Sequence, residues 1–422
     1  MSGGPGFRFL HAADLHLDSP LEGLARRGAV GGRFAGASRR ALENLVEAAI
    51  EERVAFVVIA GDVFDGDWRD YATGQFLIRQ MARLARAAIP VFAVRGNHDA
   101  ENVITKALPP TTGYRLFGVR AAETVRLEGL GVALHGRSFA QRHVPENVVL
   151  GYPPAVPGWF NIGVLHTSLD GREGHGAYAP CTVDDLRRRG YDYWALGHVH
   201  ARELVAQDPP ILFPGNLQGR HARETGPKGA TLVTVEAGRV VAMKALTLDA
   251  ARFDHIRVDV SGLAGRPALY DRLRGAIAAA FRSAEGRPLA LRVTLEGAGP
   301  LHGALAGRLE QTQEEVQALA FESDADLLIE KLVDRTEPPG GAERAIAVPG
   351  FEAALAEAAA DPLLRAALAE TLATLAGRLP REALDATGLG QEAGDADAAI
   401  GAALALLRAA LAGPAGADGR TP

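Results

Sequence analysis

The stretch Phe56-Val57-Val58-Ile59-Ala60-Gly61-Asp62-Val63-Phe64-Asp65 decides how the rest of the chain is interpreted. Its apolar first half, followed by a glycine, predicts a buried parallel strand and a sharp turn where that strand ends. Asp62 then lies at the carboxyl end of a central strand, where open α/β sheets place their ligands. Because a carboxylate has two oxygens, Asp62 can bridge two metal ions about 3.5–4 Å apart. This interpretation requires further ligands at other strand ends.

Length and composition describe an ordinary globular chain. Its 422 residues, 47% hydrophobic and 23% charged, are expected to form two or three domains with a sizeable core. A single cysteine, Cys181, excludes an internal disulfide framework and fits a reducing cytosol. We find no signal peptide and no apolar stretch long enough to cross a bilayer, so we expect a cytoplasmic protein without membrane contact. The net charge of −6 implies that any contact with nucleic acid is local and assisted by bound cations.

A second polar cluster follows the first predicted strand. Phe7–Ala13 is apolar and alternating, and it leads into Asp14-Leu15-His16. On an extended segment, Asp14 and His16 would point to the same side. That arrangement suits two ligands of one metal ion, whereas the alternative is an aspartate that caps the next helix.

Helices are predicted over Arg39–Arg53 and Gln75–Ala88, which places the central strand in a β-α-β unit. Between these helices, Asp65, Asp67 and Asp70 are expected to be solvated loop carboxylates or partners of the ligands. Asp65 is the one that we expect to orient a ligand.

A third cluster follows the predicted strand Val91–Val94, in the sequence Arg95-Gly96-Asn97-His98-Asp99. The amide oxygen of Asn97 is an acceptable ligand for a hard divalent ion. His98 is the next residue and cannot easily face the same ion, so we interpret it as a general acid or charge stabiliser at the scissile phosphate. For this dipeptide alone a turn would be the better interpretation, but it is the third polar cluster at a strand end.

Histidines end two further strands. The apolar stretch Phe160–Leu165 ends in His166, and Tyr193–Leu196 ends in Gly197 followed by His198 and His200. Alternation places the last two imidazoles on one side, where each can reach a different ion of a pair. The ring of His166 is expected to be held by three residues that follow it in the sequence: Thr167, Ser168 and Asp170.

The remaining polar residues are less specific. His135 and His143 lack partners at ligand spacing and are interpreted as structural. Phe213–His221 is a glycine-rich polar loop, and paired strands are predicted after it over Gly229–Val235 and Arg239–Leu248. Four residues are expected to orient ligands or to contact substrate: Asp65, Asp99, Arg220 and His221.

Taken in order, these motifs (D-x-H, G-D, G-N-H-D, H, G-H-x-H) closely resemble the calcineurin-like metallophosphoesterase superfamily over roughly residues 1–245. Two segments, His11–Pro20 and Phe213–His221, the latter followed by Gly226-Pro227-Lys228-Gly229, resemble the SbcD and YhaO-type DNA-repair exonucleases. The resemblance implies an α/β fold, a four-layer β-sandwich flanked by helices. It also implies a small α+β capping domain and a helical C-terminal segment.

The resemblance further implies two divalent ions, with manganese preferred, which mixed oxygen and nitrogen ligation suits. One ion would take Asp14, His16, Asp62 and His200. The other would take Asp62, Asn97, His166 and His198. Asp62 and His98 would be catalytic, in hydrolysis by metal-activated water. The implied activity is that of a DNA-repair nuclease, a 3′-to-5′ exonuclease and single-strand endonuclease. The implied partners are DNA and a coiled-coil SMC-like ATPase of the SbcC/YhaN type. The resemblance is also compatible with a homodimer. The implied location is the cytoplasm, in association with the nucleoid.

Three domains are expected: a phosphoesterase domain over 1–250, an α+β capping domain over 251–337, and a helical segment with a disordered tail over 338–422. In the second, strands are predicted over Asp254–Val260, Leu289–Leu295 and Leu327–Val333, and helices from Pro267 and over Leu301–Leu319.

After the linker Glu337–Gly341, two leucine-rich stripes follow at helical spacing: Leu364, Leu368, Leu372, Leu375 and Leu379, then Ile400, Leu404, Leu407 and Leu411. They indicate either a self-packed helical hairpin or a surface that docks the base of the coiled-coil ATPase.

Two other functions remain open. A phosphodiesterase or phosphomonoesterase for small nucleotides would use the same metal ligands, but it would need neither a capping domain nor a helical tail. A non-catalytic scaffold would be marked by lost ligands, and none is missing from the motifs.

Overall fold

The computed structural model describes residues 6–19, 24, 34, 36–65, 71–101, 112–170, 178–339, 350–378, 399–401, 403 and 404. The expectations for Pro20, Asp67, Asp70, Leu379, Leu407, Leu411 and the C-terminal tail lie outside these residues. The chain divides into two compact units: Met1–His255 with Ala278–Arg292 and Ala320–Glu330, and Ile256–Ile277 with Val293–Leu319 and Lys331–Pro422. The three-domain division stays a prediction.

The first six-stranded sheet has the order β12-β11-β1-β2-β3-β4. Its strands are β1 (Phe7–Ala12), β2 (Phe56–Ile59), β3 (Val91–Ala93), β4 (Tyr114–Leu116), β11 (Gly229–Glu236) and β12 (Arg239–Thr247). Strands β1 to β4 run parallel, whereas β11 pairs antiparallel with β1 and β12. The central strand β2 is buried along its whole length, as its apolar sequence predicts.

The second six-stranded sheet has the order β5-β6-β7-β8-β10-β9. Its strands are β5 (Glu123–Leu127), β6 (Val132–Gly136), β7 (Phe160–His166), β8 (Tyr193–Gly197), β9 (Glu203–Gln207) and β10 (Pro210–Phe213). β6, β7, β8 and β10 are parallel, and the edge strands β5 and β9 are antiparallel to their neighbours.

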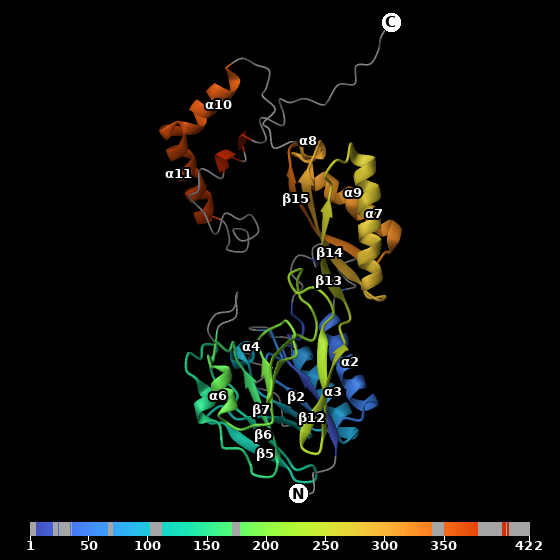
Figure 1. Ribbon diagram of the computed structural model, residues 1–422, viewed down its shortest axis with the longest axis vertical. Helices are drawn as coiled ribbons and strands as arrows, with labels where there is room; N and C mark the ends of the chain where they lie inside the picture. The colour runs from blue at the N-terminus through green and yellow to red at the C-terminus, as the bar shows by residue number, and fades with distance from the viewer. Residues whose placement is uncertain are drawn as a thin grey trace. The chain divides into compact units, whose positions relative to one another are not determined.

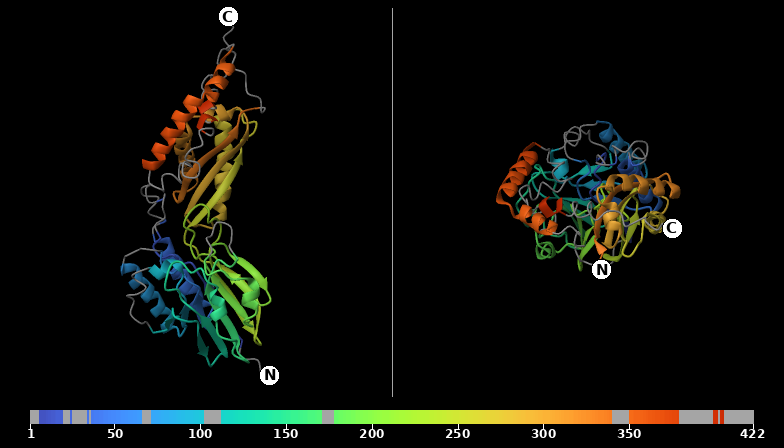
Figure 2. Two further views of the ribbon diagram at one scale, coloured as in Figure 1. Left: turned by 90° about the vertical axis from the view of Figure 1, so that its left-hand side faces the viewer. Right: turned by 90° about the horizontal axis from the view of Figure 1, so that it is seen from above.

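The two sheets pack face to face. One apolar core joins residues of β1 and β2, such as Phe9 and Phe56, to residues of β7 and β8, such as Ile162 and Tyr193. On the outer face of the first sheet, a second core includes α2 (Ala37–Glu51) and α3 (Tyr71–Arg86). On the outer face of the second sheet, a third core includes residues of η1 (Val148–Gly151) and α6 (Val183–Arg187). The result is a four-layer α/β sandwich (Figure 1), which Figure 2 shows from a second side.

From Arg252 on, the chain forms a three-stranded sheet in the order β13-β14-β15. Its elements are β13 (Arg252–Asp259), α7 (Arg266–Ser283), β14 (Leu289–Ala298), α8 (Leu301–Leu305), α9 (Leu309–Ser323) and β15 (Leu327–Glu337). The single helix expected over Leu301–Leu319 is wrong. Gly307 adopts a left-handed φ of 71° between α8 and α9, and such a backbone ends a helix.

The helices α10 (Phe351–Ala360) and α11 (Pro362–Arg378) follow. Most of the described side chains of α11 are exposed, and Leu363 is 81% exposed. In the predicted stripe, Leu364 is exposed, whereas Leu368 and Leu372 are half-buried. Across the described part of the chain, no helix combines the length and apolarity that a membrane span requires.

Candidate metal centre

The site is built where the parallel strands end. After β1, the chain stays hydrogen-bonded to the loop that follows β2: the Asp14 amide donates to the Gly61 carbonyl (3.0 Å) and the His16 amide to the Asp62 carbonyl (3.0 Å). The short helix α4 (Asn97–Glu101) starts directly after β3 and brings Asn97 and His98 to the same edge.

The local backbone is not extended, so the predicted alternation of Asp14 and His16 is wrong. Left-handed φ values occur at Asp14 (51°), His16 (42°), Asp62 (51°) and His198 (108°). A non-glycine residue held in such a conformation costs about 1–3 kcal/mol, and such residues cluster at functional sites. The predicted ligand side chains therefore come together because the backbone turns sharply at these residues, and not because residues alternate along a strand.

Close packing at this edge depends on glycine. A side chain at Gly96 would overlap the Asp62 carboxylate, and one at Gly61 would overlap the His166 ring. These two glycines let the side chains of different strands meet.

One group of ligand atoms comprises Asp14, His16 and His200, whose ligating atoms lie within 4.8 Å of one another. The Nε2 atoms of His16 and His200 face each other at 3.2 Å. The Nδ1 of His200 donates to Glu224 Oε1 at 2.6 Å, which fixes the ring. All three side chains are largely buried.

A second group comprises Asp62, His166 and His198, together with Asn97. His166 Nε2 lies 3.0 Å from Asn97 Oδ1, 3.3 Å from Asp62 Oδ2 and 3.3 Å from His198 Nδ1. Its Nδ1 donates to the Ala60 carbonyl at 2.9 Å, so Nε2 of the neutral ring carries a lone pair. The lone pair of His166 Nε2 faces Asn97 Oδ1 and Asp62 Oδ2, which are also hydrogen-bond acceptors. A cation bound between these atoms removes the repulsion among them.

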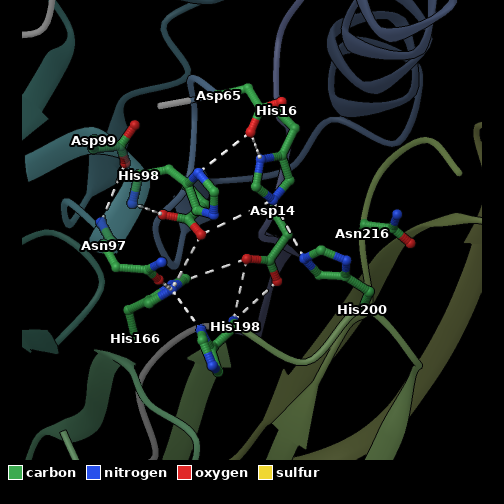
Figure 3. Close-up of polar contacts among 12 residues, drawn as sticks. Asp14, His16, Asp65, Asn97, His98, Asp99, His166, His198, His200 and Asn216 are labelled. Atoms are coloured by element: carbon green, nitrogen blue, oxygen red, sulfur yellow. Dashed lines mark hydrogen bonds and ion pairs between the residues drawn. The ribbon is translucent and has the colours of Figure 1, made fainter. Parts of the chain in front are cut away.

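Asp62 belongs to the second group and also lies beside His16 of the first group. Its Oδ2 lies 3.3 Å from His166 Nε2 and 3.9 Å from His16 Nε2, while its Oδ1 accepts from the His98 amide at 2.9 Å. Its side chain is only 2% exposed. Figure 3 shows His16 and His200 on one side of the site and Asn97 and His166 on the other.

The charges of the side chains around the site favour the binding of a cation there. Burial works to lower the pKa of His166, but the charges of Asp62 and Asp14 and a hydrogen bond to Asp62 outweigh it and raise this pKa to about 9. Burial also works to raise the pKa of Asp62, but the neighbouring histidines hold it well below its usual range. An ionised carboxylate beside buried imidazoles provides the oxygen and nitrogen ligands of a divalent transition-metal site.

His98 lies at the edge of this set. Its ring is 26% exposed, and its Nδ1 lies 3.3 Å from Asp65 Oδ1, the oxygen that also lies 3.3 Å from His16 Nδ1. Ser19 Oγ donates to the other oxygen of Asp65 at 2.6 Å. Burial works to lower the pKa of His98, but the bond to Asp65 and the charges of Asp62 and Asp65 raise it. His98 also lies within ligand distance of His16 and Asp62, so its role as catalyst rather than ligand stays a prediction.

The other predicted partners have separate roles. Asp99 is buried and accepts from the amides of Val63 (3.1 Å), Phe64 (2.9 Å) and Gly96 (3.2 Å), so it fixes backbone rather than a ligand. Burial, and then the charge of Asp62, raise its pKa to about 6.

The polar loop between β10 and β11 brings two further predicted residues, Arg220 and His221, to the site. One guanidinium nitrogen of Arg220 lies 3.4 Å from Asp65 Oδ1 and another lies 3.4 Å from His200 Nδ1. His221 is half exposed and lies 3.5 Å from Glu224.

The expected support of His166 by its sequence neighbours is wrong. Thr167 Oγ1 donates to the Ala179 carbonyl and Ser168 Oγ to the Tyr178 carbonyl, so both hydroxyls fix the chain behind the site. His135 is structural as predicted, because its ring is held between Thr124 and Asn161.

Sequence reasoning missed three residues: Glu224, Asn216 and Tyr178. Glu224 binds His200, Asn216 and Arg220, and it lies three residues beyond the polar loop predicted over Phe213–His221. The Tyr178 ring stacks on His198 with centroids 5.4 Å apart, and no pattern in the sequence marks it.

Two family models match the chain: calcineurin-like phosphoesterase over residues 7–202, and the middle domain of metallophosphoesterase YhaO over residues 253–337. The chain belongs to the calcineurin-like metallophosphoesterase family, which uses a dinuclear metal centre. It is 33% identical over 346 residues to a Bacillus subtilis protein named uncharacterized metallophosphoesterase YhaO, covering 78% of this chain and 82% of that protein.

A second relative is the DNA double-strand break repair protein Mre11 of Methanopyrus kandleri, which is 24% identical over 364 residues. That match covers 78% of this chain and 71% of the relative. Among solved structures, a dimetal phosphatase from Danio rerio has a TM-score of 0.35 at 12% identity, over 57% of this chain and 96% of that one. Family membership supports a metal-dependent phosphoesterase, and the ligand assignment to individual residues stays a prediction.

Proposed function

We propose that the protein is a DNA nuclease that uses two divalent ions, most favourably manganese, as a 3′-to-5′ exonuclease and single-strand endonuclease in DNA repair. The observation that carries the proposal is the position of Asp62, whose Oδ2 faces a histidine of each ligand group. The similarity to a protein named for DNA double-strand break repair supports DNA as the substrate.

Two divalent ions, when bound, supply charge neutralisation at the phosphate and activation of the attacking water. The chain provides the rest. His16 and His200 on one side, and His166 with Asn97 on the other, would hold the two ions. Asp62 keeps the two groups together.

His98 would act on the leaving oxygen. Its Nδ1 is engaged by Asp65, so the ring is oriented and Nε2 remains for the substrate. Its ring is 26% exposed, whereas the side chains of His16 and His166 are buried, so a phosphate would have access to it. Arg220, whose cationic group lies beside Asp65 and His200, would neutralise a phosphate oxygen.

The proposed partner is a coiled-coil SMC-like ATPase of the SbcC/YhaN type. The exposed leucines of α11, among them Leu363 and Leu364, support an outward-facing apolar surface on this helix. The proposed location is the cytoplasm, with the nucleoid.

The test is an assay of the purified protein with Mn²⁺ on end-labelled single-stranded and double-stranded DNA, beside a chromogenic phosphodiester and small nucleotides. Stepwise release of nucleotides from the 3′ end supports the proposal. Hydrolysis of small nucleotides without DNA cleavage would instead support a small-nucleotide phosphodiesterase. Absence of all hydrolysis with two ions bound would support a scaffold.

A further inference from the structure

The loop between β10 and β11 passes directly behind one half of the metal centre. Asn216 bridges to Ala13, and its amide donates to the His200 carbonyl at 3.2 Å. The next amide, of Leu217, donates to the Asp14 carbonyl at 3.4 Å. The loop is therefore registered against the segments that carry two candidate ligands.

Glu224 is the buried carboxylate of this loop, with a side chain only 7% exposed. Its Oε1 accepts from His200 Nδ1 at 2.6 Å. Its Oε2 accepts from Asn216 Nδ2 at 2.8 Å and from the Arg220 amide at 2.7 Å. Because each oxygen has its own donors, the carboxylate cannot rotate, and its orientation is set by the loop.

This contact decides which nitrogen of His200 carries the hydrogen. A nitrogen 2.6 Å from a carboxylate oxygen is a donor, so Nδ1 holds the hydrogen and Nε2 keeps its lone pair. That lone pair points toward His16 Nε2, 3.2 Å away.

The other half of the centre is held differently. His166 Nδ1 donates to a neutral carbonyl, that of Ala60. The two halves of the centre thus differ: His200 donates to a charged carboxylate, whereas His166 donates to a neutral carbonyl.

From this asymmetry we infer that Glu224 is a positioning residue for one ion only, the ion held by Asp14, His16 and His200. The inference rests on the two-metal centre of the proposed function, and it does not depend on the substrate. Glu224 acts through His200, whose tautomer and orientation it fixes.

The substitution Glu224→Gln separates this role from simple support of the loop. The glutamine oxygen can still accept from Asn216 and Arg220, which keeps the loop. Its amide then presents a donor to His200 Nδ1, which favours the tautomer with hydrogen on Nε2. The lone pair needed for ligation is lost although the loop is kept.

The experiment measures Mn²⁺ binding to wild-type protein, Glu224→Gln and the control Glu236→Gln, whose exposed side chain ends β11. Each protein is stripped with a chelator, titrated with Mn²⁺ and studied by elemental analysis and EPR. We expect two ions in the wild type and control. We expect one in Glu224→Gln at concentrations where the wild type holds two, with the second ion weakened about 10–100-fold. The spin-coupled EPR signal should give way to the six-line signal of isolated Mn²⁺.

Two ions bound to Glu224→Gln with wild-type affinity, or loss of both ions together, would overturn the inference. Fewer than two ions in the wild type would instead contradict the proposed function. If Glu224→Gln does not fold, ¹⁵N NMR of histidine-labelled wild-type protein loaded with diamagnetic Zn²⁺ decides the question. The inference requires a hydrogen on His200 Nδ1, and an unprotonated Nδ1 would refute it.

Discussion

Replacing Asp62 by asparagine should weaken both ions together. In the structure Oδ1 accepts from the His98 amide while Oδ2 faces His166 at 3.3 Å and His16 at 3.9 Å. Asparagine has only one oxygen. If that oxygen keeps the bond to His98, the amide nitrogen points donors at the place where both ions are expected. If the amide is turned, the His98 amide loses its acceptor.

The size of the effect follows from charge. We take the 3.3 Å between His166 Nε2 and Asp62 Oδ2 as the distance between the two charges. At an effective dielectric constant of about 20, two unit charges at this distance interact by about 5 kcal/mol. A neutral oxygen can still ligate one ion, so the net loss should be smaller. We expect about 10²–10³-fold weaker binding of each ion, which corresponds to about 3–4 kcal/mol.

The assay is calorimetric titration of chelator-stripped Asp62→Asn with Mn²⁺, together with hydrolysis of a chromogenic phosphodiester. Asp184→Asn is the matched control, since its side chain is 70% exposed on α6. Metal content and turnover should fall in parallel in Asp62→Asn and stay unchanged in the control. Full occupancy of two ions in Asp62→Asn would refute the shared position of this carboxylate.

Three further variants test other parts of the account. His98→Ala should keep both ions but lose turnover by about 10²–10⁴-fold, and a site lost in Mn²⁺ titration would show that His98 is a ligand. Gly96→Ala should displace the Asp62 carboxylate and lower Mn²⁺ affinity while circular dichroism stays that of the wild type; unchanged affinity would contradict the packing argument. Truncation after Pro339 should keep near full-length hydrolysis of a small phosphodiester but abolish co-purification with the cognate coiled-coil ATPase, and retention of the ATPase by the truncated protein would refute docking through the C-terminal helices.

Sequence patterns located the strand ends because each is marked by an apolar run followed by glycine or charge. Asp62 after β2 and Asn97 after β3 lie at the carboxyl ends of the first sheet for this reason, and His166 and the histidines after β8 lie at those of the second sheet. Parallel strands bring their carboxyl ends together whatever the length of the connections, so the convergence could be predicted without knowing the loops.

The parts that could not be predicted depend on loop path. Aspartate and histidine adopt a left-handed φ more often than most non-glycine residues, but still so rarely that the turns at Asp14 and His16 could not be predicted. Glu224 lies in an irregular loop without periodicity, and only the fold shows that it reaches His200. The helix break before α9 was missed because one glycine in an apolar stretch is often tolerated within a helix.

The measurement that tests the central claim most directly is cleavage of 3′-labelled single-stranded DNA as Mn²⁺ is titrated into chelator-stripped protein, with bound metal counted in the same samples. The account predicts that cleavage stays near background with one bound ion and rises as the second ion binds. Full cleavage with a single ion, or no DNA cleavage with two bound ions, would contradict it.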